Sequence, residues 1–159
     1  MSVSNLLELC AYLDVPNTKT IQMVHPLTEQ VNDVSPGGGS ALHFVALGKN
    51  LELAAWLFVN GAKFCTNEYE ETPLHWACRG GHVPMVKLFL RNMTYKQIIA
   101  KDHQGKTAFD WATAFQLEEI AYLIDRSTTR TARFHSFRVS VHKRFQHFRA
   151  SKHMLGLPS

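Results

Sequence analysis

The feature that most constrains this chain is a short pattern that recurs along it at nearly constant spacing. Residues 72–82 read TPLHWACRGGH. One related stretch begins at Ser40 and reads SALHFVALGKN, and another begins at Thr107 and reads TAFDWAT. The first begins 32 residues before Thr72 and the second begins 35 residues after it. Self-similarity at a period of this length indicates a stack of repeated units.

The clearest copy resembles a known family of repeats. The run TPLHWA at residues 72–77, the Gly-His that follows it and the spacing resemble the ankyrin repeat, whose period is about 33 residues. The resemblance covers about residues 33–125 and, more faintly, residues 5–32. It implies an all-α fold, a solenoid of about four helix-turn-helix repeats with finger-like turns and irregular end repeats. We expect a repeat domain at 1–126, with a degenerate capping repeat at 1–33 and further repeats at 34–66, 67–101 and 102–126.

Local signals predict where the helices lie. Thr72 suits a helix N-cap, and Pro73 suits the first helical position because no N–H is needed there. Gly61 suits a left-handed helix end. We expect helices near residues 5–13, 19–24, 41–47, 51–59, 72–79, 82–91, 108–115 and 118–124, with Ser127-Thr128-Thr129 marking the end of the stack.

Three positions depart from the repeat pattern. Glu70 stands where the family usually has glycine, and glutamate resists a positive φ, so we expect an altered turn there. Residues 93–101 carry the extra length of their repeat, which predicts a longer second helix or loop around residues 95–99. Asp110 replaces the family's His, and at neutral pH it only accepts hydrogen bonds. We therefore interpret Asp110 as marking the C-terminal capping repeat.

The charge of the chain is divided unevenly. Residues 1–126 hold ten Lys and Arg against thirteen Asp and Glu, a net charge of −3. Residues 127–159 hold seven Lys and Arg and no acid, a net charge of +7. The basic balance therefore belongs to the tail, and such asymmetry is itself a hint about function.

Other bulk features favour an intracellular protein, in the cytoplasm or nucleus. The first fourteen residues, MSVSNLLELCAYLD, make a poor signal peptide because no basic residue precedes the apolar stretch. No apolar run is long enough to span a bilayer. The three cysteines, Cys10, Cys65 and Cys78, show neither disulfide nor metal spacing, which fits a reducing compartment.

The sequence offers only weak candidates for a metal, phosphate or catalytic site. His75, Cys78 and His82 have a spacing that would suit zinc on one continuous helix, but Gly80-Gly81 should break that helix. Gly37-Gly38-Gly39 lacks the lysine of a phosphate-binding loop and is better interpreted as a finger turn. The adjacent acids, such as Glu70-Glu71, are typical of solvated surface. We expect no catalytic residue, no cofactor, no metal and no small-molecule substrate.

We interpret the tryptophans as packing residues rather than as contacts for a partner. Trp76 and Trp111 occupy the same repeat position, immediately after His75 and Asp110. That position faces the neighbouring repeat, so we expect both rings to stack there.

The resemblance also implies a partner-binding surface. In the ankyrin family, partners usually bind the concave side, which is built from the fingers and first helices. Carried over to this sequence, the positions expected to be exposed there include Phe115 as a weaker candidate and, in the main set, Glu68, Tyr69, Glu71, Arg79, His103, Gln104 and Lys106.

The tail offers a second candidate surface. Phe134, Phe137, Val141, Phe145 and Phe148 recur at helical spacing, which predicts a basic amphipathic helix. Such a helix either packs back on the last repeat or docks on an anionic membrane, a nucleic acid or a calmodulin-like acidic partner. The candidate contacts in the tail are Arg133, Arg138, Lys143, Arg144 and Arg149.

The sequence therefore predicts a non-enzymatic adaptor or decoy that binds another protein through its fingers and concave face. The alternative is a scaffold whose basic tail is the active part.

Overall fold

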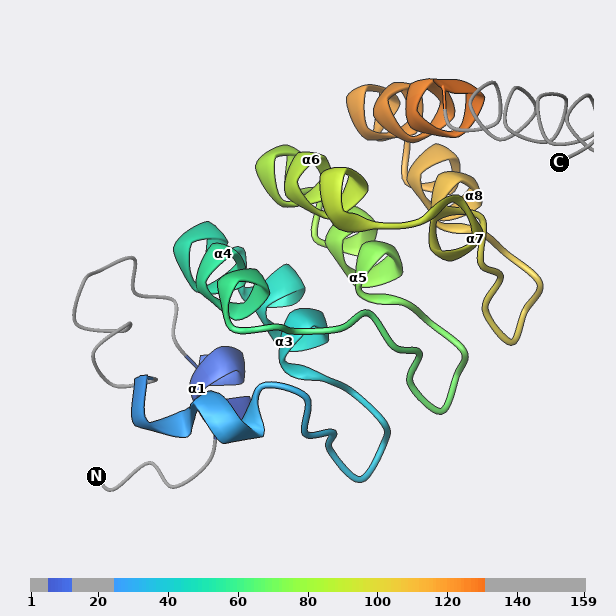
Figure 1. Ribbon diagram of the computed structural model, residues 1–159. Helices are drawn as coiled ribbons and strands as arrows, with labels where there is room; N and C mark the ends of the chain where they lie inside the picture. Colours follow the sequence, from blue (N-terminus) through green and yellow to red (C-terminus); the bar gives the residue numbers. More distant parts are fainter. Residues whose placement is uncertain (1–5, 13–24, 131–159) are drawn as a thin grey trace, which may run out of the picture.

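The computed structural model describes residues 6–12 and 25–130, which form an elongated stack of helices (Figure 1). Residues 118–130 are also helical and follow the last of the named elements. The predicted helix near residues 19–24 and the whole of segment 131–159 lie outside the described residues. The named elements are α1 (Leu6–Tyr12), η1 (His25–Gln30), α3 (Ala41–Gly48), α4 (Leu51–Val59), α5 (Pro73–Arg79), α6 (Val83–Asn92), α7 (Tyr95–Ile98) and α8 (Ala108–Ala114).

The helices form two layers, and finger-like turns project from one side (Figure 1). The first helices of successive repeats, α1, α3, α5 and α8, pack on one another in series, and α4 packs on α6 in the second layer. The fingers are residues 34–40, 66–72 and 101–107; the first and third each close with an isolated β-bridge. The all-α solenoid predicted from the repeats is confirmed.

Small side chains let the first helices approach closely. Ala41, Ala77 and Ala108 occupy the first or inner positions of three such helices, and each is fully buried. Larger apolar side chains fill the space between the two layers, where burial of each contributes about 1.5–3 kcal/mol. The largest of these buried apolar residues include Leu42, Leu53, Leu57, Leu74, Met85 and Phe89.

The altered turn expected at Glu70 is wrong. Glu70 adopts a φ of 58°, close to the 75° of Gly38 and the 74° of Gly105 at the same place in the other fingers. The side-chain oxygen of Asn67 accepts from the backbone N–H groups of Tyr69 and Glu71, at 3.0 and 2.9 Å. These bonds hold the turn in the same shape as the other fingers, and Glu70 adopts the left-handed conformation in which glycine would be favoured.

The extra residues of the third repeat fold as one additional helical turn, α7, rather than as an extension of α6. Thr94 and Gln97 form a capping box at its start, with the Gln97 side chain accepting from the Thr94 N–H at 2.8 Å. Ile98 is buried and anchors the turn to the core.

Ser127-Thr128-Thr129, predicted to mark the end of the stack, does not interrupt the helix, because residues 118–130 are helical throughout. The hydroxyls of Thr128 and Thr129 donate to the backbone carbonyl of Asp125, at 2.7 and 3.0 Å. Threonine in a helix commonly bonds to the carbonyl of the preceding turn, so these residues do not end the helix. The domain boundary predicted after residue 126 therefore falls within a helix.

Candidate functional site

The fingers are held by side chains at equivalent positions. In the third finger the Asp102 carboxylate accepts from the backbone N–H groups of Gln104 and Lys106, both at 2.9 Å. Asn67 plays the same part in the second finger. Each finger is therefore a small preformed hairpin rather than a loose loop.

Neighbouring fingers are joined by backbone hydrogen bonds. The Glu68 N–H donates to the Gly37 carbonyl at 3.1 Å, and the His103 N–H donates to the Tyr69 carbonyl at 3.0 Å. A Cβ on Gly38 would lie 3.1 Å from the backbone of Asn67, so glycine allows this close approach. The positive φ of Gly38 and this close packing between fingers together explain the glycine turn.

Two buried histidines, His43 on α3 and His75 on α5, each connect their own helix to the following finger. The Nδ1 atom of His75 accepts from the Thr72 N–H at 3.0 Å, and its Nε2 contacts the Lys106 carbonyl at 3.3 Å. His43 repeats this arrangement, with Nδ1 at 3.1 Å from the Ser40 nitrogen. One ring nitrogen accepts and the other donates, which requires the neutral imidazole.

Burial favours the same neutral state. Burial lowers the pKa of both His43 and His75 below the usual value, and it outweighs the nearby acids and carbonyls that act in the opposite direction. Because both nitrogens of His75 are engaged, this side chain serves the stack and does not point a free nitrogen at a metal. Cys78 is fully buried, and burial raises its thiol pKa to about 12.

Glu71 is a correction to the predicted binding surface. Its side chain was expected to be exposed, but only 9% of the side chain is accessible. The carboxylate accepts from the Trp76 Nε1–H at 2.7 Å and from the Asn67 amide at 3.0 Å, and it pairs with Arg79. Burial opposes its ionisation, but these three donors prevail and hold the pKa of Glu71 below the ordinary value. Glu71 therefore stabilises the finger and is not available to a partner.

A shallow depression of about 370 Å³ lies between the first two fingers and the helices behind them. Phe44 and Trp76 form an apolar wall, with ring centroids 5.8 Å apart and edge-on geometry. Glu68, Tyr69 and Arg79 also line the depression, beside backbone atoms of the first finger. Glu71 lies at the same place, so four residues of the predicted set are brought together around two aromatic rings.

The sequence interpretation assigned Trp76 to stacking between repeats. Its ring does pack edge-on against His43 and Phe44 of the preceding repeat, which confirms that assignment. The same ring also lines the depression, and this second role was missed, as was that of Phe44. A signal was present, because an aromatic residue follows the repeat's His or Asp at 44, 76 and 111.

The remaining predicted residues lie along the third finger. His103 packs beside Tyr69, with ring centroids 5.5 Å apart. The Lys106 ammonium lies 4.6 Å from the centre of the Trp111 ring. Gln104 is exposed and lies outside the depression.

Trp111 is placed differently from Trp76. It stacks on Phe115 of its own segment, with centroids 5.6 Å apart, rather than on an aromatic ring of the preceding repeat. Across the repeat boundary it meets the Arg79 guanidinium, 5.7 Å from the ring centre. A line of aromatic and cationic groups therefore continues from the depression along the first helices.

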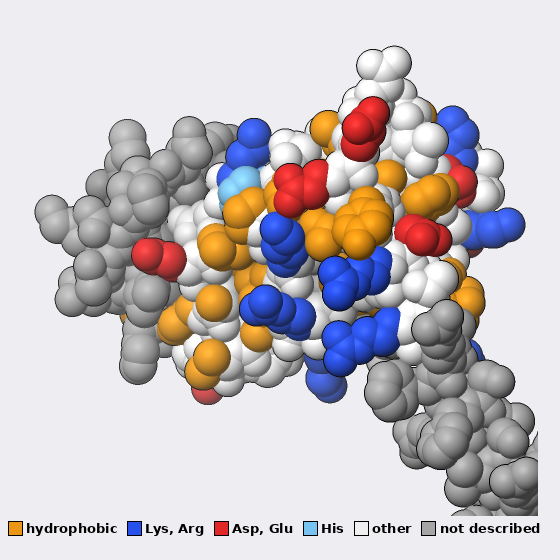
Figure 2. Space-filling model, turned by 90° about the horizontal axis from the view of Figure 1, so that it is seen from above, with side chains coloured by type: hydrophobic (Ala, Val, Ile, Leu, Met, Phe, Trp, Pro, Cys, Tyr) orange, Lys and Arg blue, Asp and Glu red, His pale blue; other side chains and the backbone are white. Residues whose placement is uncertain are grey.

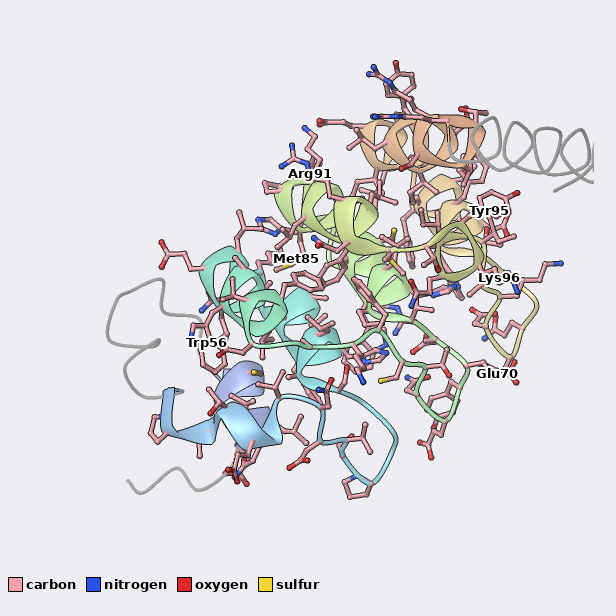
Figure 3. All side chains as sticks on the ribbon, viewed as in Figure 1. Trp56, Glu70, Met85, Arg91, Tyr95 and Lys96 are labelled. Carbon is pink, nitrogen blue, oxygen red and sulfur yellow. The ribbon has the colours of Figure 1, made fainter. Side chains whose placement is uncertain are left out.

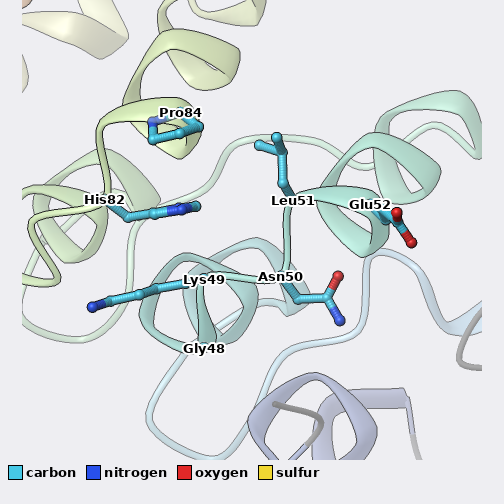
Figure 4. Close-up of a pocket in the computed structure, with 7 residues that line it drawn as sticks. All are labelled: Gly48, Lys49, Asn50, Leu51, Glu52, His82 and Pro84. Carbon is cyan, nitrogen blue, oxygen red and sulfur yellow. The ribbon is translucent and has the colours of Figure 1, made fainter. Parts of the chain in front are cut away.

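Another hollow, of about 430 Å³, lies where the second helices begin (Figure 4). His82 points into it, and Glu52 points away from His82. Burial and the charge of Lys49 lower the pKa of His82. Within the described residues, no group of three or more His, Cys, Asp or Glu side chains is placed to hold a metal.

The predicted contacts in the tail cannot be placed. Arg133, Arg138, Lys143, Arg144 and Arg149 lie outside the described residues, and their role stays a prediction. Among the described helices, none has both the length and the apolar character needed to cross a bilayer.

Comparison with known proteins agrees with this geometry. A family model described as ankyrin repeats in three copies matches residues 42–132, more than half of the chain. Over 55 residues the chain is 42% identical to a mouse (Mus musculus) protein named palmitoyltransferase ZDHHC13, and 40% identical to the proteins of that name from Homo sapiens and Pongo abelii. Each match covers 33% of this chain and only 9% of the relative.

Proposed function

Because this chain belongs to the ankyrin-repeat family, whose repeats are modules of protein–protein interaction, we propose that it is an adaptor or decoy. In this proposal it binds a segment of another protein in the depression beside the first two fingers. The observation that carries the proposal is the pairing of an aromatic wall, Phe44 and Trp76, with the polar rim of Glu68, Tyr69 and Arg79. Aromatic residues and arginine are enriched where protein interfaces concentrate their binding energy.

Part of the rim is held in place by contacts within the stack. Arg79 is fixed by Glu71, and the second finger is tied to both neighbouring fingers by backbone hydrogen bonds. A preformed surface loses less conformational entropy on binding than a mobile one. The geometry suits an extended segment that places an apolar side chain against Trp76 and a donor group near Glu68.

We propose that the stack has no catalytic activity of its own. The buried histidines are engaged in joining repeats, and the thiols of Cys10 and Cys78 are held protonated by burial, with pKa values raised to about 12. The match covers only 9% of the length of these palmitoyltransferases, so their enzymatic name is not an argument for catalysis by this stack. An intracellular location is part of this proposal.

The test is quantitative capture from lysate with the full chain and a matched pair of double variants. Glu68→Lys with Tyr69→Ala changes the rim, whereas Glu52→Lys with Val59→Ala changes exposed positions on α4, where Val59 is 86% exposed. We expect the rim variant to lose its specific partner at least tenfold and the α4 variant to retain it. Equal capture by both variants would show that the partner binds elsewhere.

A further inference from the structure

The outer side of the stack, away from the fingers, carries a groove of about 680 Å³ between α6 and the helix at 118–130. Figure 2 views the molecule from this side and shows Lys and Arg side chains gathered across the middle of the face. Figure 3 labels Arg91, which stands on α6 at this side. The groove is lined by Lys87, Leu90, Arg91, Met93, Leu123, Arg126, Ser127 and Arg130.

The lining is arranged as two facing helical stripes. Lys87 and Arg91 lie four residues apart on α6, and Arg126 and Arg130 lie four residues apart on the opposite helix, so each pair shares one helix face. Leu90 and Leu123, both partly buried, lie among these cations as apolar lining. The result is an apolar strip bordered by positive charge on both sides.

Of these four cations, one is paired within the stack and three have no ionic partner among the described residues. Lys87 pairs with Glu119 at 3.1 Å, on the exposed surface. Arg91, Arg126 and Arg130 form no ion pair with any residue in the described part of the chain. Like charges at this helical spacing repel each other, so an anionic ligand would relieve an unfavourable arrangement.

We propose that this groove binds an acidic segment of a partner protein, in which Asp or Glu residues alternate with apolar side chains. Charge complementarity selects this occupant. The segments outside the described ranges, 1–5, 13–24 and 131–159, hold a single acid, Asp14, so this chain does not supply a matching acidic segment from them.

The apolar strip also distinguishes this occupant from other polyanions. Leu90, Met93 and Leu123 line the space between two helices, where a flat lipid surface makes poor contact. A nucleic-acid backbone has no apolar group to cover these three side chains. A peptide supplies both the carboxylates and the apolar side chains.

The experiment measures binding of a fluorescein-labelled peptide of about 12 residues, built from Asp, Glu and Leu, which as a helix would be about 18 Å long. A second peptide replaces every acid by its amide. Fluorescence anisotropy with the full chain compares two double variants that change the net charge equally. Arg91→Glu with Arg126→Glu reverses the groove, and Lys63→Glu with Lys96→Glu reverses exposed lysines outside it.

We expect the groove variant to bind the acidic peptide at least tenfold more weakly than the unchanged chain, and the lysine variant to bind within about twofold. The amide peptide should bind weakly to all of them. If the groove variant does not fold by circular dichroism, Arg91→Gln with Arg126→Gln replaces it and Lys63→Gln with Lys96→Gln becomes its matched control.

Equal weakening by the two variants would overturn the proposal, since the basic tail or the overall charge would then explain the binding. The proposal would also be overturned if the unchanged chain bound the amide peptide as tightly as the acidic peptide. The proposal also fails if the acidic peptide does not bind, or if phosphatidylserine vesicles or single-stranded RNA bind in its place through Arg91 and Arg126.

Discussion

The Nε2 atom of His43 donates a hydrogen bond to the backbone carbonyl of Glu71, 3.0 Å away and 28 positions further along the chain. The donor role follows from the other ring nitrogen, which accepts from the Ser40 N–H. His75 repeats the arrangement one repeat later, at 3.3 Å from the Lys106 carbonyl. Each imidazole therefore links its own helix to the next finger through Nε2, whereas its Nδ1 can accept the N–H at the start of its own helix only in the neutral state.

This relationship predicts that the stack weakens in mild acid. Burial lowers the pKa of His43 and His75 in the folded state, whereas an unfolded imidazole takes up its proton near pH 6.5. Below about pH 6.5 the unfolded state therefore binds more protons, and the free energy of unfolding falls as the pH falls. Each such group contributes up to about 1.4 kcal/mol per pH unit until its folded pKa is reached.

Urea unfolding at pH 7.5, 6.5 and 5.5 measures this effect, above the range in which carboxylates titrate. His43→Gln cannot titrate, so this variant should lose less stability between pH 6.5 and 5.5 than the unchanged chain does. An identical pH dependence in the two proteins would show that His43 does not carry the effect.

Replacing Glu71 should damage the fold itself. Glu71→Ala leaves the Trp76 Nε1–H and the Asn67 amide without their acceptor, which should lower the free energy of unfolding by about 2–3 kcal/mol. Glu68→Ala, at an exposed position of the same finger, should change it by no more than about 0.5 kcal/mol. Chemical denaturation of both variants checks the difference; if both had equally small effects, Glu71 would not hold the finger.

Replacing Glu70 should have the opposite effect. Glu70→Gly removes the cost of a left-handed backbone, about 1–2 kcal/mol, and adds the greater chain entropy of glycine in the unfolded state. We expect a net gain in stability of about 0.5–1 kcal/mol, measured by thermal and urea unfolding. Gly105→Ala is the matched control, because its φ is 74° and a Cβ there meets no atom within 4 Å, so it should lose stability through backbone strain alone. A loss on Glu70→Gly would contradict this account of the turn.

The three cysteines should react very differently with a thiol reagent. Cys10 and Cys78 are buried, and burial raises the pKa of each to about 12. Cys65 is partly accessible. Ellman's reagent should therefore modify one thiol quickly in the native protein and all three after denaturation. In Cys65→Ser the fast phase should vanish, and a fast phase that remained would show that a buried cysteine is accessible.

Much of the fold could be predicted because the repeat signals are local. Thr72 and Pro73 predict the start of α5, and α4 occupies residues 51–59 as expected. The end repeats were harder, since Ser127-Thr128-Thr129 looks like a break but its hydroxyls bond within the helix. Local composition does not show whether such hydroxyls turn outward or back to the chain.

The candidate site was less predictable because it depends on contacts between repeats. Glu70 and Glu71 look alike in the sequence, yet one is exposed at the finger tip and the other is buried against Trp76 and Arg79. Figure 3 shows Glu70 on the projecting finger. Only the hairpin geometry of the finger decides which of these two adjacent glutamate side chains turns inward. For the same reason the contact of Phe44 with Trp76 was not predicted, since it depends on how their two helices pack.

The most direct test of the proposed binding surface is site-specific photo-crosslinking in cells. A benzophenone amino acid replaces Tyr69, which lines the depression and is 52% exposed, or Val59 on α4, which is 86% exposed. We expect the probe at Tyr69 to form a discrete crosslinked species with one protein, and the probe at Val59 not to form it. Recovery of the same partner from Val59 but not from Tyr69 would contradict the assignment of binding to the fingers.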